Sequence, residues 1–223
     1  MNEPLVIFDC DGVLVDSEPI SIAVLREVIA GAGHEIDEDT AYRLFLGRSM
    51  TSISEALVDS VGLTITAEHL GLIRTELFSR FRAELRPIPG IRDVLTAMTQ
   101  RRCVASSSKP ERIRLSLQVT GLLDLQEPDI YSATMVKRGK PAPDLFLFAA
   151  DAMGARPADC IVVEDSPAGI EAGKAAGMRV LAFAGGSHAR AGALVEAFSR
   201  LAPDAIFDDM RQLPALLDEA VPR

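Results

Sequence analysis

The sequence predicts an α/β protein in which a parallel sheet is covered by helices and an all-helical segment is inserted after the first strand. Short apolar runs rich in β-branched residues recur along the 223 residues and alternate with stretches of helical length. This alternation is typical of parallel sheets with helices on both faces. It is interrupted once, because the interval from Ser17 to about Arg86 contains no convincing strand.

Six apolar runs are predicted as strands. Their composition suits strands that are buried on both faces, as in a parallel sheet. The helix-length stretches between most of them would cross over from one strand to the next. The runs are Leu5–Cys10, Cys103–Ser106, Ile130–Thr134, Cys160–Glu164, Val180–Ala184 and the shorter Ala205–Phe207.

The interval without strands has apolar residues at helical spacing, which predicts a small helical bundle. Gly31 and Gly33 would end its first helix, Gly47 lies in a turn after a short helix, Gly62 would end the third and Thr66 can cap the fourth. The apolar positions that define the pattern are Ile20, Val24, Val28, Ile53, Leu57, Val61, Leu70, Ile73, Leu77 and Phe81.

Two short segments would join the bundle to the sheet. The stretch Arg86–Gly90 combines two prolines with a glycine, which is typical of a linker. Asp16–Glu18 would form the other half of a hinge. We therefore predict a cap domain over residues 17–87, inserted into a core formed by residues 1–16 and 88–223.

The composition excludes several classes of function. With 23 Lys and Arg against 32 Asp and Glu, the formal charge is −9, and no basic patch for nucleic acid is visible. No apolar run approaches the ~18 to 20 residues that span a bilayer. The N-terminus lacks the basic start and apolar stretch of a signal peptide. These features predict a cytoplasmic protein with neither a nucleic-acid nor a membrane partner, and we expect a monomer or weak homodimer.

The cysteines and histidines show no pattern of a metal site. The cysteines fall in or beside predicted interior strands and lack zinc-type spacing, so buried reduced thiols are expected at Cys10, Cys103 and Cys160. The histidines lack ligand or triad spacing. We predict surface positions for all three, which are His34, His69 and His188.

Polar side chains follow the predicted strands at their carboxyl ends, where open parallel sheets bind ligands. Asp9 and Asp11 follow the first strand, Ser106 ends the second, and Glu164 and Asp165 end the fourth. Acids crowded at the end of a buried strand repel each other unless a cation or a proton offsets their charge. The sequence therefore predicts a charged ligand at this edge of the sheet.

Two more segments add groups to the same edge. Ser108 to Glu111 is a capping-box sequence that opens a helix. The segment GKPAPD places Lys140 in a proline-stiffened loop ahead of another helix. Carboxylate oxygens suit Mg²⁺, whereas a lysine and helix N-termini suit phosphate oxygens. A carboxylate can also act as a nucleophile, so the combined set predicts phosphoryl transfer.

Four segments resemble, in order and spacing, the motifs of the haloacid dehalogenase superfamily, in its β-phosphoglucomutase-like subgroup with a helical cap after the first strand. DCDGVLVDS resembles the first motif, VASSS the second, the lysine of GKPAPD the third and VVEDSPAGIEAGKAAGM the fourth. The resemblance covers essentially the whole chain. It implies a Rossmann-like parallel-sheet core and an inserted cap domain.

The resemblance also implies a role for each matching residue. Asp9 would attack phosphorus to form an aspartyl-phosphate. Asp11 would protonate the leaving alkoxide and then activate the water that cleaves the intermediate. Ser106 and Lys140 would bind the oxygens of the transferring phosphoryl group and offset their charge.

A magnesium ion is implied as the cofactor. Asp9, the backbone carbonyl of Asp11 and Asp165 would hold it, with Glu164 acting directly or through water. The substrate would also contact residues near the second motif and in the cap. These further candidates are Ser108, Lys109, Gly47 and Arg48.

Departures from the family patterns narrow the reaction. Dehalogenases lack the second aspartate, which is present here as Asp11, and phosphonoacetaldehyde hydrolases need a cap lysine, which this chain lacks. A β-phosphoglucomutase-like sugar phosphomutase stays open, although Ser21 and Pro110 replace that enzyme's histidine and asparagine. A catalytically silent metabolite-binding module is the alternative from another class. We predict a Mg²⁺-dependent phosphatase of a small phosphorylated metabolite, with sugar and polyol phosphates as the favoured class and the cap as the part that selects the substrate.

Overall fold

The sheet has six parallel strands in the spatial order β3-β2-β1-β4-β5-β6. The structure is a computed structural model that describes residues 4–46, 48–190 and 193–219. All six predicted strands are present, including the short last one. Their bounds are Leu5–Phe8 for β1, Arg102–Ser106 for β2, Ile130–Ser132 for β3, Cys160–Glu164 for β4, Arg179–Phe183 for β5 and Ala205–Phe207 for β6.

Strand β1 lies in the middle of the sheet and is fully buried. Phe8 is in register with Val104 of β2 on one side and with Val163 of β4 on the other. The residues after these three positions therefore lie next to one another at the carboxyl edge of the sheet. This register places Asp9 between the ends of β2 and β4.

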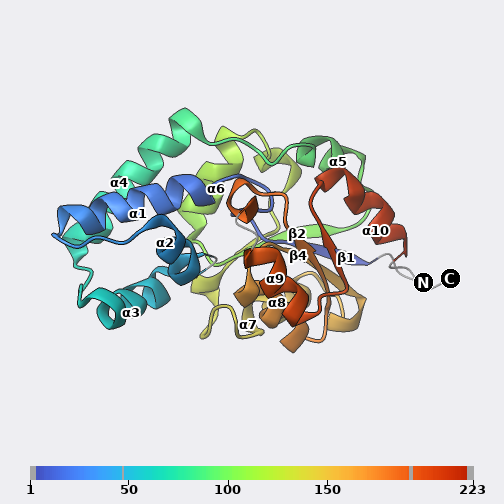
Figure 1. Cartoon of the computed structure of the whole chain (residues 1–223). Coiled ribbons are helices and arrows are strands. Elements are labelled where there is room, and N and C mark those ends of the chain that lie inside the picture. Colours follow the sequence, from blue (N-terminus) through green and yellow to red (C-terminus); the bar gives the residue numbers. More distant parts are fainter. Residues whose placement is uncertain (1–3, 47, 191–192, 220–223) are drawn as a thin grey trace.

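Helices cover both faces of the sheet, as the alternation of strands and helices predicts (Figure 1). Because side chains alternate along a strand, Val6 and Phe8 belong to one apolar cluster and Leu5 and Ile7 to the other. The first face is covered by α5 (Ile91–Ala97), α6 (Pro110–Val119) and α10 (Leu213–Glu219), and the second by α7 (Asp144–Ala152), α8 (Pro167–Ala175) and α9 (Ala193–Leu201).

The predicted helical bundle is also present. Its helices are α1 (Glu18–Gly31), α2 (Glu38–Phe45), α3 (Met50–Val61) and α4 (Ala67–Glu84). Figure 1 shows these four helices to one side of the sheet, beyond its carboxyl edge. The predicted ends are confirmed at Gly62, which ends α3 with φ of 70°, and at Thr66, whose side chain accepts from the backbone N–H of His69.

The two segments that connect the bundle to the sheet run side by side. Val15 forms an antiparallel bridge with Pro87. The backbone N–H of Asp16 donates to the carbonyl of Arg86 at 3.0 Å, and the N–H of Ile88 donates to the carbonyl of Leu14 at 3.0 Å. The two connections are therefore hydrogen-bonded to each other.

Two other expectations concern the cysteines and membrane-spanning helices. The three cysteines are buried and free, as predicted from their place in the interior strands. Within the described ranges, no helix combines the length and apolar character needed to cross a bilayer.

Candidate active site

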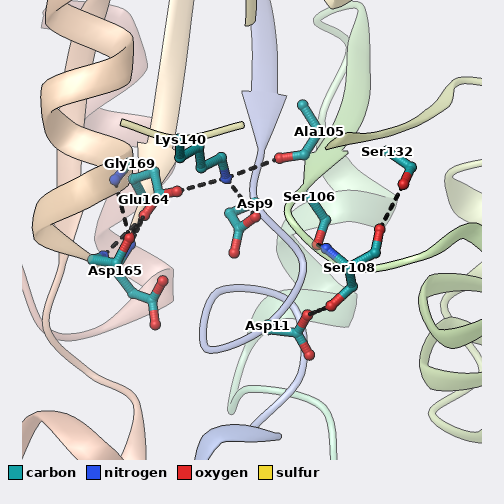
Figure 2. Close-up of polar contacts among 11 residues, drawn as sticks. Asp9, Asp11, Ala105, Ser106, Ser108, Ser132, Lys140, Glu164, Asp165 and Gly169 are labelled. Carbon is teal, nitrogen blue, oxygen red and sulfur yellow. Dashed lines mark hydrogen bonds and ion pairs between the residues drawn. The ribbon is translucent and has the colours of Figure 1, made fainter. Parts of the chain in front are cut away.

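Lys140 lies between two acids at the carboxyl edge of the sheet. Its ammonium donates to Asp9 Oδ1 and to Glu164 Oε1, both at 2.7 Å, and to the carbonyl of Ala105 at 3.1 Å. Figure 2 shows these contacts meeting at the Lys140 nitrogen. The structure therefore brings the first, third and fourth segments of the sequence together.

The charge on this lysine is stabilised by its surroundings. Its side chain is 1% exposed, and burial alone would lower its pKa, but Asp9 and Glu164 outweigh burial and raise the pKa above its ordinary value. The ammonium also lies 4.8 Å from the centre of the Phe146 ring, whose face attracts a cation. Lys140 is thus a fixed buried cation next to Asp9.

Glu164, which was expected to contact the metal directly or through water, has protein donors at both carboxylate oxygens. One of its oxygens accepts from Lys140. The other accepts from the backbone N–H groups of Asp165 and Ser166 and from the Ser166 hydroxyl, at 2.8 to 2.9 Å. Because protein donors occupy both oxygens, this carboxylate orients Lys140 and the turn that opens α8. Ser166 caps α8 by accepting from the backbone N–H of Gly169 at 3.1 Å.

Asp9 and Asp165 keep carboxylate oxygens without a protein donor. Within the described part of the chain, no hydrogen bond reaches Asp9 Oδ2 or Asp165 Oδ1. Burial raises the pKa of both carboxyls well above the ordinary range, and repulsion from Glu164 adds to the rise. A bound cation would relieve this repulsion, so these two acids fit a divalent metal.

The fit is specific to a hard ion that keeps some of its water. No three acidic, histidine or cysteine side chains of the described residues converge into a metal cluster. Two carboxylates, one backbone carbonyl and waters are a common arrangement for Mg²⁺, which dehydrates reluctantly. Asp9 and Asp165 supply two such carboxylates, and the family resemblance adds the carbonyl of Asp11 as the backbone ligand.

The side chain of Asp11 is turned toward the helical bundle. Its Oδ1 accepts from Ser17 at 2.6 Å and from Arg112 at 2.8 Å, and its Oδ2 accepts from Ser108 at 2.6 Å. Burial acts to raise the pKa of Asp11, but the Arg112 guanidinium and the two hydroxyls outweigh it and lower the pKa. The charge of Asp11 nevertheless acts on its neighbours, because it is among the charges that raise the pKa of Asp9 and of Asp165.

The capping-box prediction for Ser108 is wrong. Helix α6 begins at Pro110, and its N-cap is Lys109, which makes no side-chain cap. The Ser108 hydroxyl donates to Asp11 instead, and its carbonyl accepts from Ser132 at 2.7 Å (Figure 2). The backbone N–H of Ser108 donates to Ser106 Oγ at 3.1 Å, so Ser106 shapes this turn.

A pocket lies between the sheet edge and the bundle. The sheet side of its wall includes Asp9, Asp11, Ser106 and Ser108, and the bundle side includes Arg48. Apolar side chains of the bundle complete it, which are Ile22, Leu25, Phe45, Met50, Ile53, Ile73 and Leu77. Lys109 is exposed and does not line the pocket, and Gly47 lies outside the described residues.

The surface prediction for His188 is wrong. This residue is only 5% exposed, and its Nε2 lies 3.0 Å from Asp165 Oδ2. Burial lowers the pKa of the imidazole. His34 and His69 are half-buried, and His69 accepts from the backbone N–H of Thr66 within the cap of α4.

Several residues of the site carry no signal in the sequence. Arg112 lines the pocket, donates to Ser21 at 2.9 Å and stacks over Phe81 with its guanidinium carbon 5.2 Å from the ring centre. Glu18 also lines the pocket, and burial followed by repulsion from Asp11 raises its pKa to about 8. An arginine within a helix and a glutamate at a helix start are too common to be selected from sequence alone.

The family of the chain follows from comparison with known proteins. The sequence profile of haloacid dehalogenase-like hydrolases matches residues 4–177. The chain belongs to this hydrolase family. The match includes all four segments that form the site, and it confirms the resemblance seen in the sequence.

Curated relatives within the family are similar over most of their length. The chain is 33% identical over 186 residues to a 6-phosphogluconate phosphatase of Escherichia coli (strain K12), covering 82% of this chain and 83% of that protein. It is 32% identical over 176 residues to a fructose-1-phosphate phosphatase of the same organism, covering 78% and 92%.

Solved structures of this hydrolase family share the fold. A haloacid dehalogenase-like protein from Agrobacterium tumefaciens is 34% identical, with a TM-score of 0.81 and 99% of both chains covered. A family hydrolase from Deinococcus radiodurans, solved with bound phosphate and sodium, is 32% identical, with a TM-score of 0.75 and coverage of 98% and 97%. The core and the helical bundle are therefore shared with these relatives.

Proposed function

We propose that this protein is a Mg²⁺-dependent phosphatase that hydrolyses a small sugar or polyol phosphate through an aspartyl-phosphate. The observation that carries the proposal is the buried group of Asp9, Lys140 and Glu164, of which Asp9 also lines a pocket. The names of the E. coli relatives, which are phosphatases of 6-phosphogluconate and fructose 1-phosphate, support the substrate class.

Asp9 and Asp11 divide the work between them. Asp9 lies at the end of the central strand beside Lys140, so one of its carboxylate oxygens can attack phosphorus while the other would bind the metal ion. Asp11 faces the pocket and the bundle, where the leaving group would lie. Because Arg112 and the two hydroxyls favour its ionised form in the free protein, Asp11 would first take up a proton when substrate binds; it would then give that proton to the departing oxygen and accept one from the attacking water.

The remaining residues bind and neutralise the phosphoryl group. Lys140 is a fixed cation 2.7 Å from the nucleophile, and Ser106 lines the pocket beside it. Asp9, Asp165 and the carbonyl of Asp11 would hold Mg²⁺, which supplies positive charge to the phosphoryl oxygens when bound. Glu164 keeps Lys140 in place.

Residues 17–87 would act as the cap domain that encloses the substrate. The bundle contributes Arg48 and an apolar wall to the pocket, so the leaving group would contact the bundle, whereas the phosphoryl group would contact the core. Enclosure excludes bulk water from the reacting groups. A compact metabolite fits this arrangement better than a macromolecular phosphoester.

Phosphate release from a panel of sugar, polyol and sugar-acid phosphates tests the proposal. We expect release that needs Mg²⁺, stops with a chelator and is lost in Asp9→Asn. Asp39→Asn, at an exposed position in the bundle, is the matched control and should keep full activity. A folded, metal-supplemented protein that releases no phosphate from any ester would favour the silent binding module.

A second assay separates hydrolysis from phosphoryl transfer within one sugar. β-Glucose 1-phosphate should yield inorganic phosphate, whereas a phosphomutase would yield glucose 6-phosphate. Ser21, which replaces the mutase histidine, donates to the carbonyl of Ser17 at 2.8 Å and accepts from Arg112. A serine hydroxyl in these contacts does not titrate near neutral pH, which favours hydrolysis.

A further inference from the structure

His188 is a buried histidine for which the proposed reaction has no use. It lies in the 3₁₀ helix Ser187–Arg190, which follows β5. The backbone N–H of Ser187 donates to Asp16 Oδ1 at 3.0 Å, and its hydroxyl contacts the other oxygen of the same carboxylate. The turn that carries His188 is therefore held by hydrogen bonds to Asp16, which lies near the end of the first motif.

Two glycines make room for the imidazole ring. A Cβ atom on Gly186 would lie 2.5 Å from His188 Cε1, and a Cβ on Gly12 would lie 2.9 Å from the same atom. Both distances are shorter than carbon atoms tolerate, so no other residue type fits at either position without moving the ring. Gly12 and Gly186 are far apart in sequence, and both lie against the imidazole ring.

The polar atoms of this ring have no hydrogen-bond partner in the described part of the chain. Nε2 lies 3.0 Å from Asp165 Oδ2, which is within hydrogen-bond distance, but its N–H is not aligned with that oxygen. Nδ1 is also buried and unpartnered. Leaving a buried polar group unpaired costs about 1 to 3 kcal/mol, so a small rotation that aligns Nε2 with Asp165 is favourable.

We propose that His188 is a positioning residue for Asp165: it holds one carboxylate oxygen so that the other faces the divalent cation. This inference rests on the proposed function, because it assumes that Asp165 is a ligand of the cation. A ligand is usually oriented by a hydrogen bond from a neighbouring residue, and such a contact restricts its rotation. Here the ring itself is fixed by the two glycines.

The proposal explains why the two oxygens of Asp165 differ. Oδ2 faces the imidazole, and no protein donor of the described residues contacts Oδ1. Figure 2 shows the carboxylates of Asp165 and Asp9 on the same side of Lys140 and Glu164, below them in the view. Without His188, the Asp165 carboxylate can rotate and would bind the cation with either oxygen or with none.

Cation binding measured without substrate tests the proposal directly. The dissociation constant for Mn²⁺, a spectroscopic substitute for Mg²⁺, is measured by electron paramagnetic resonance of the free ion and by calorimetry. We expect His188→Ala to weaken binding by about 10-fold to 100-fold, the usual effect of losing such a contact. His188→Gln keeps an N–H donor and should recover part of the affinity. His34→Ala removes a half-buried imidazole from the bundle and serves as the control.

Each outcome decides the proposal. Equal Mn²⁺ affinity in the unsubstituted protein and in both folded His188 variants overturns it, and circular dichroism of the metal-free proteins establishes that they are folded. If His188→Ala does not fold, His188→Leu, which fills similar space without an N–H donor, takes its place, and equal Mn²⁺ affinity of the folded His188→Leu variant and the unsubstituted protein overturns the proposal. Electron spin echo modulation from a directly bound imidazole nitrogen would make His188 a ligand and also overturn the positioning role. An unsubstituted protein that binds no Mn²⁺ or Mg²⁺ contradicts the proposed function itself.

Discussion

Replacement of Lys140 by methionine tests the central charge arrangement of the site. The ammonium lies 2.7 Å from an oxygen of Asp9 and 2.7 Å from an oxygen of Glu164. Methionine has a similar length and no charge, so the substitution removes both ion pairs with little loss of packing. Two buried acids are then left without their cation, and the metal-free protein must either keep them charged or protonate them.

The size of the effect follows from the burial of these groups. The exposed fractions are 1% for the side chains of Lys140 and Glu164 and 10% for that of Asp9. Removing one partner of such a buried ion pair costs about 3 to 5 kcal/mol. For a chain of 150–250 residues, about 2 to 4 °C is lost per kcal/mol, so the Tm should fall by about 6 to 20 °C.

Calorimetry at neutral pH with a chelator present measures this effect. Lys109→Met makes the same chemical change at an exposed position and should shift the Tm by no more than about 2 °C. The double variant Lys140→Met with Glu164→Gln should recover part of the loss, because one of the two unpaired charges is gone. A Tm of Lys140→Met within about 2 °C of the unsubstituted protein would refute the reasoning.

Three further predictions concern other contacts. Burial and repulsion from Asp11 raise the pKa of Glu18 from 4.5 to about 8, so the folded state keeps a proton that the unfolded chain releases. The free energy of unfolding should therefore fall as pH rises from 4.5 to 8, by at most about 1.4 kcal/mol per pH unit. Denaturant titrations should show a smaller fall with pH in Glu18→Gln than in the unsubstituted protein. An equal fall in the two proteins would contradict this. Gly33→Ala should cost only the left-handed backbone strain of about 1 to 2 kcal/mol, since open space surrounds it. Gly12→Ala has similar backbone strain and also drives its Cβ into the Asp165 carboxylate. Phosphate release should therefore be lost in Gly12→Ala and kept in Gly33→Ala. Equal activity of the two alanine variants would contradict the role of Asp165. Arg112→Met removes a charged hydrogen bond to Asp11 worth about 1.5 to 3 kcal/mol. The value of kcat/KM should therefore fall about 10-fold to 150-fold, with partial recovery in Arg112→Lys. An unchanged kcat/KM would show that Asp11 acts independently of Arg112.

The sheet and the acids at its edge were predictable because they depend on local pattern. A buried parallel strand is apolar throughout, so the first polar residue after it marks its end, as Asp9 does after Phe8. The register of β1 with β2 and β4 then brings Ser106 and Glu164 beside it. The helices of the bundle were predictable for the same reason, since their apolar spacing and glycine ends are local.

The parts that were missed depend on packing between distant segments. Ser108 fits a capping box in sequence, but its hydroxyl is used by Asp11, which is 97 residues away along the chain. The residues next to His188 in sequence do not predict its burial, because Gly12 and Asp165 come close to it only in the folded protein. Arg112 likewise gains its partners from other elements.

The paired connections between core and bundle limit how the two parts can move. Because Val15 bridges Pro87 and Asp16 bonds Arg86, the outgoing and returning chains form one narrow ribbon. Sliding one connection along the other would break these backbone hydrogen bonds, whereas bending the ribbon would keep them. If the bundle moves as a cap, we expect the ribbon to guide it back to the same place, so that each closure would return the same side chains to the same substrate atoms.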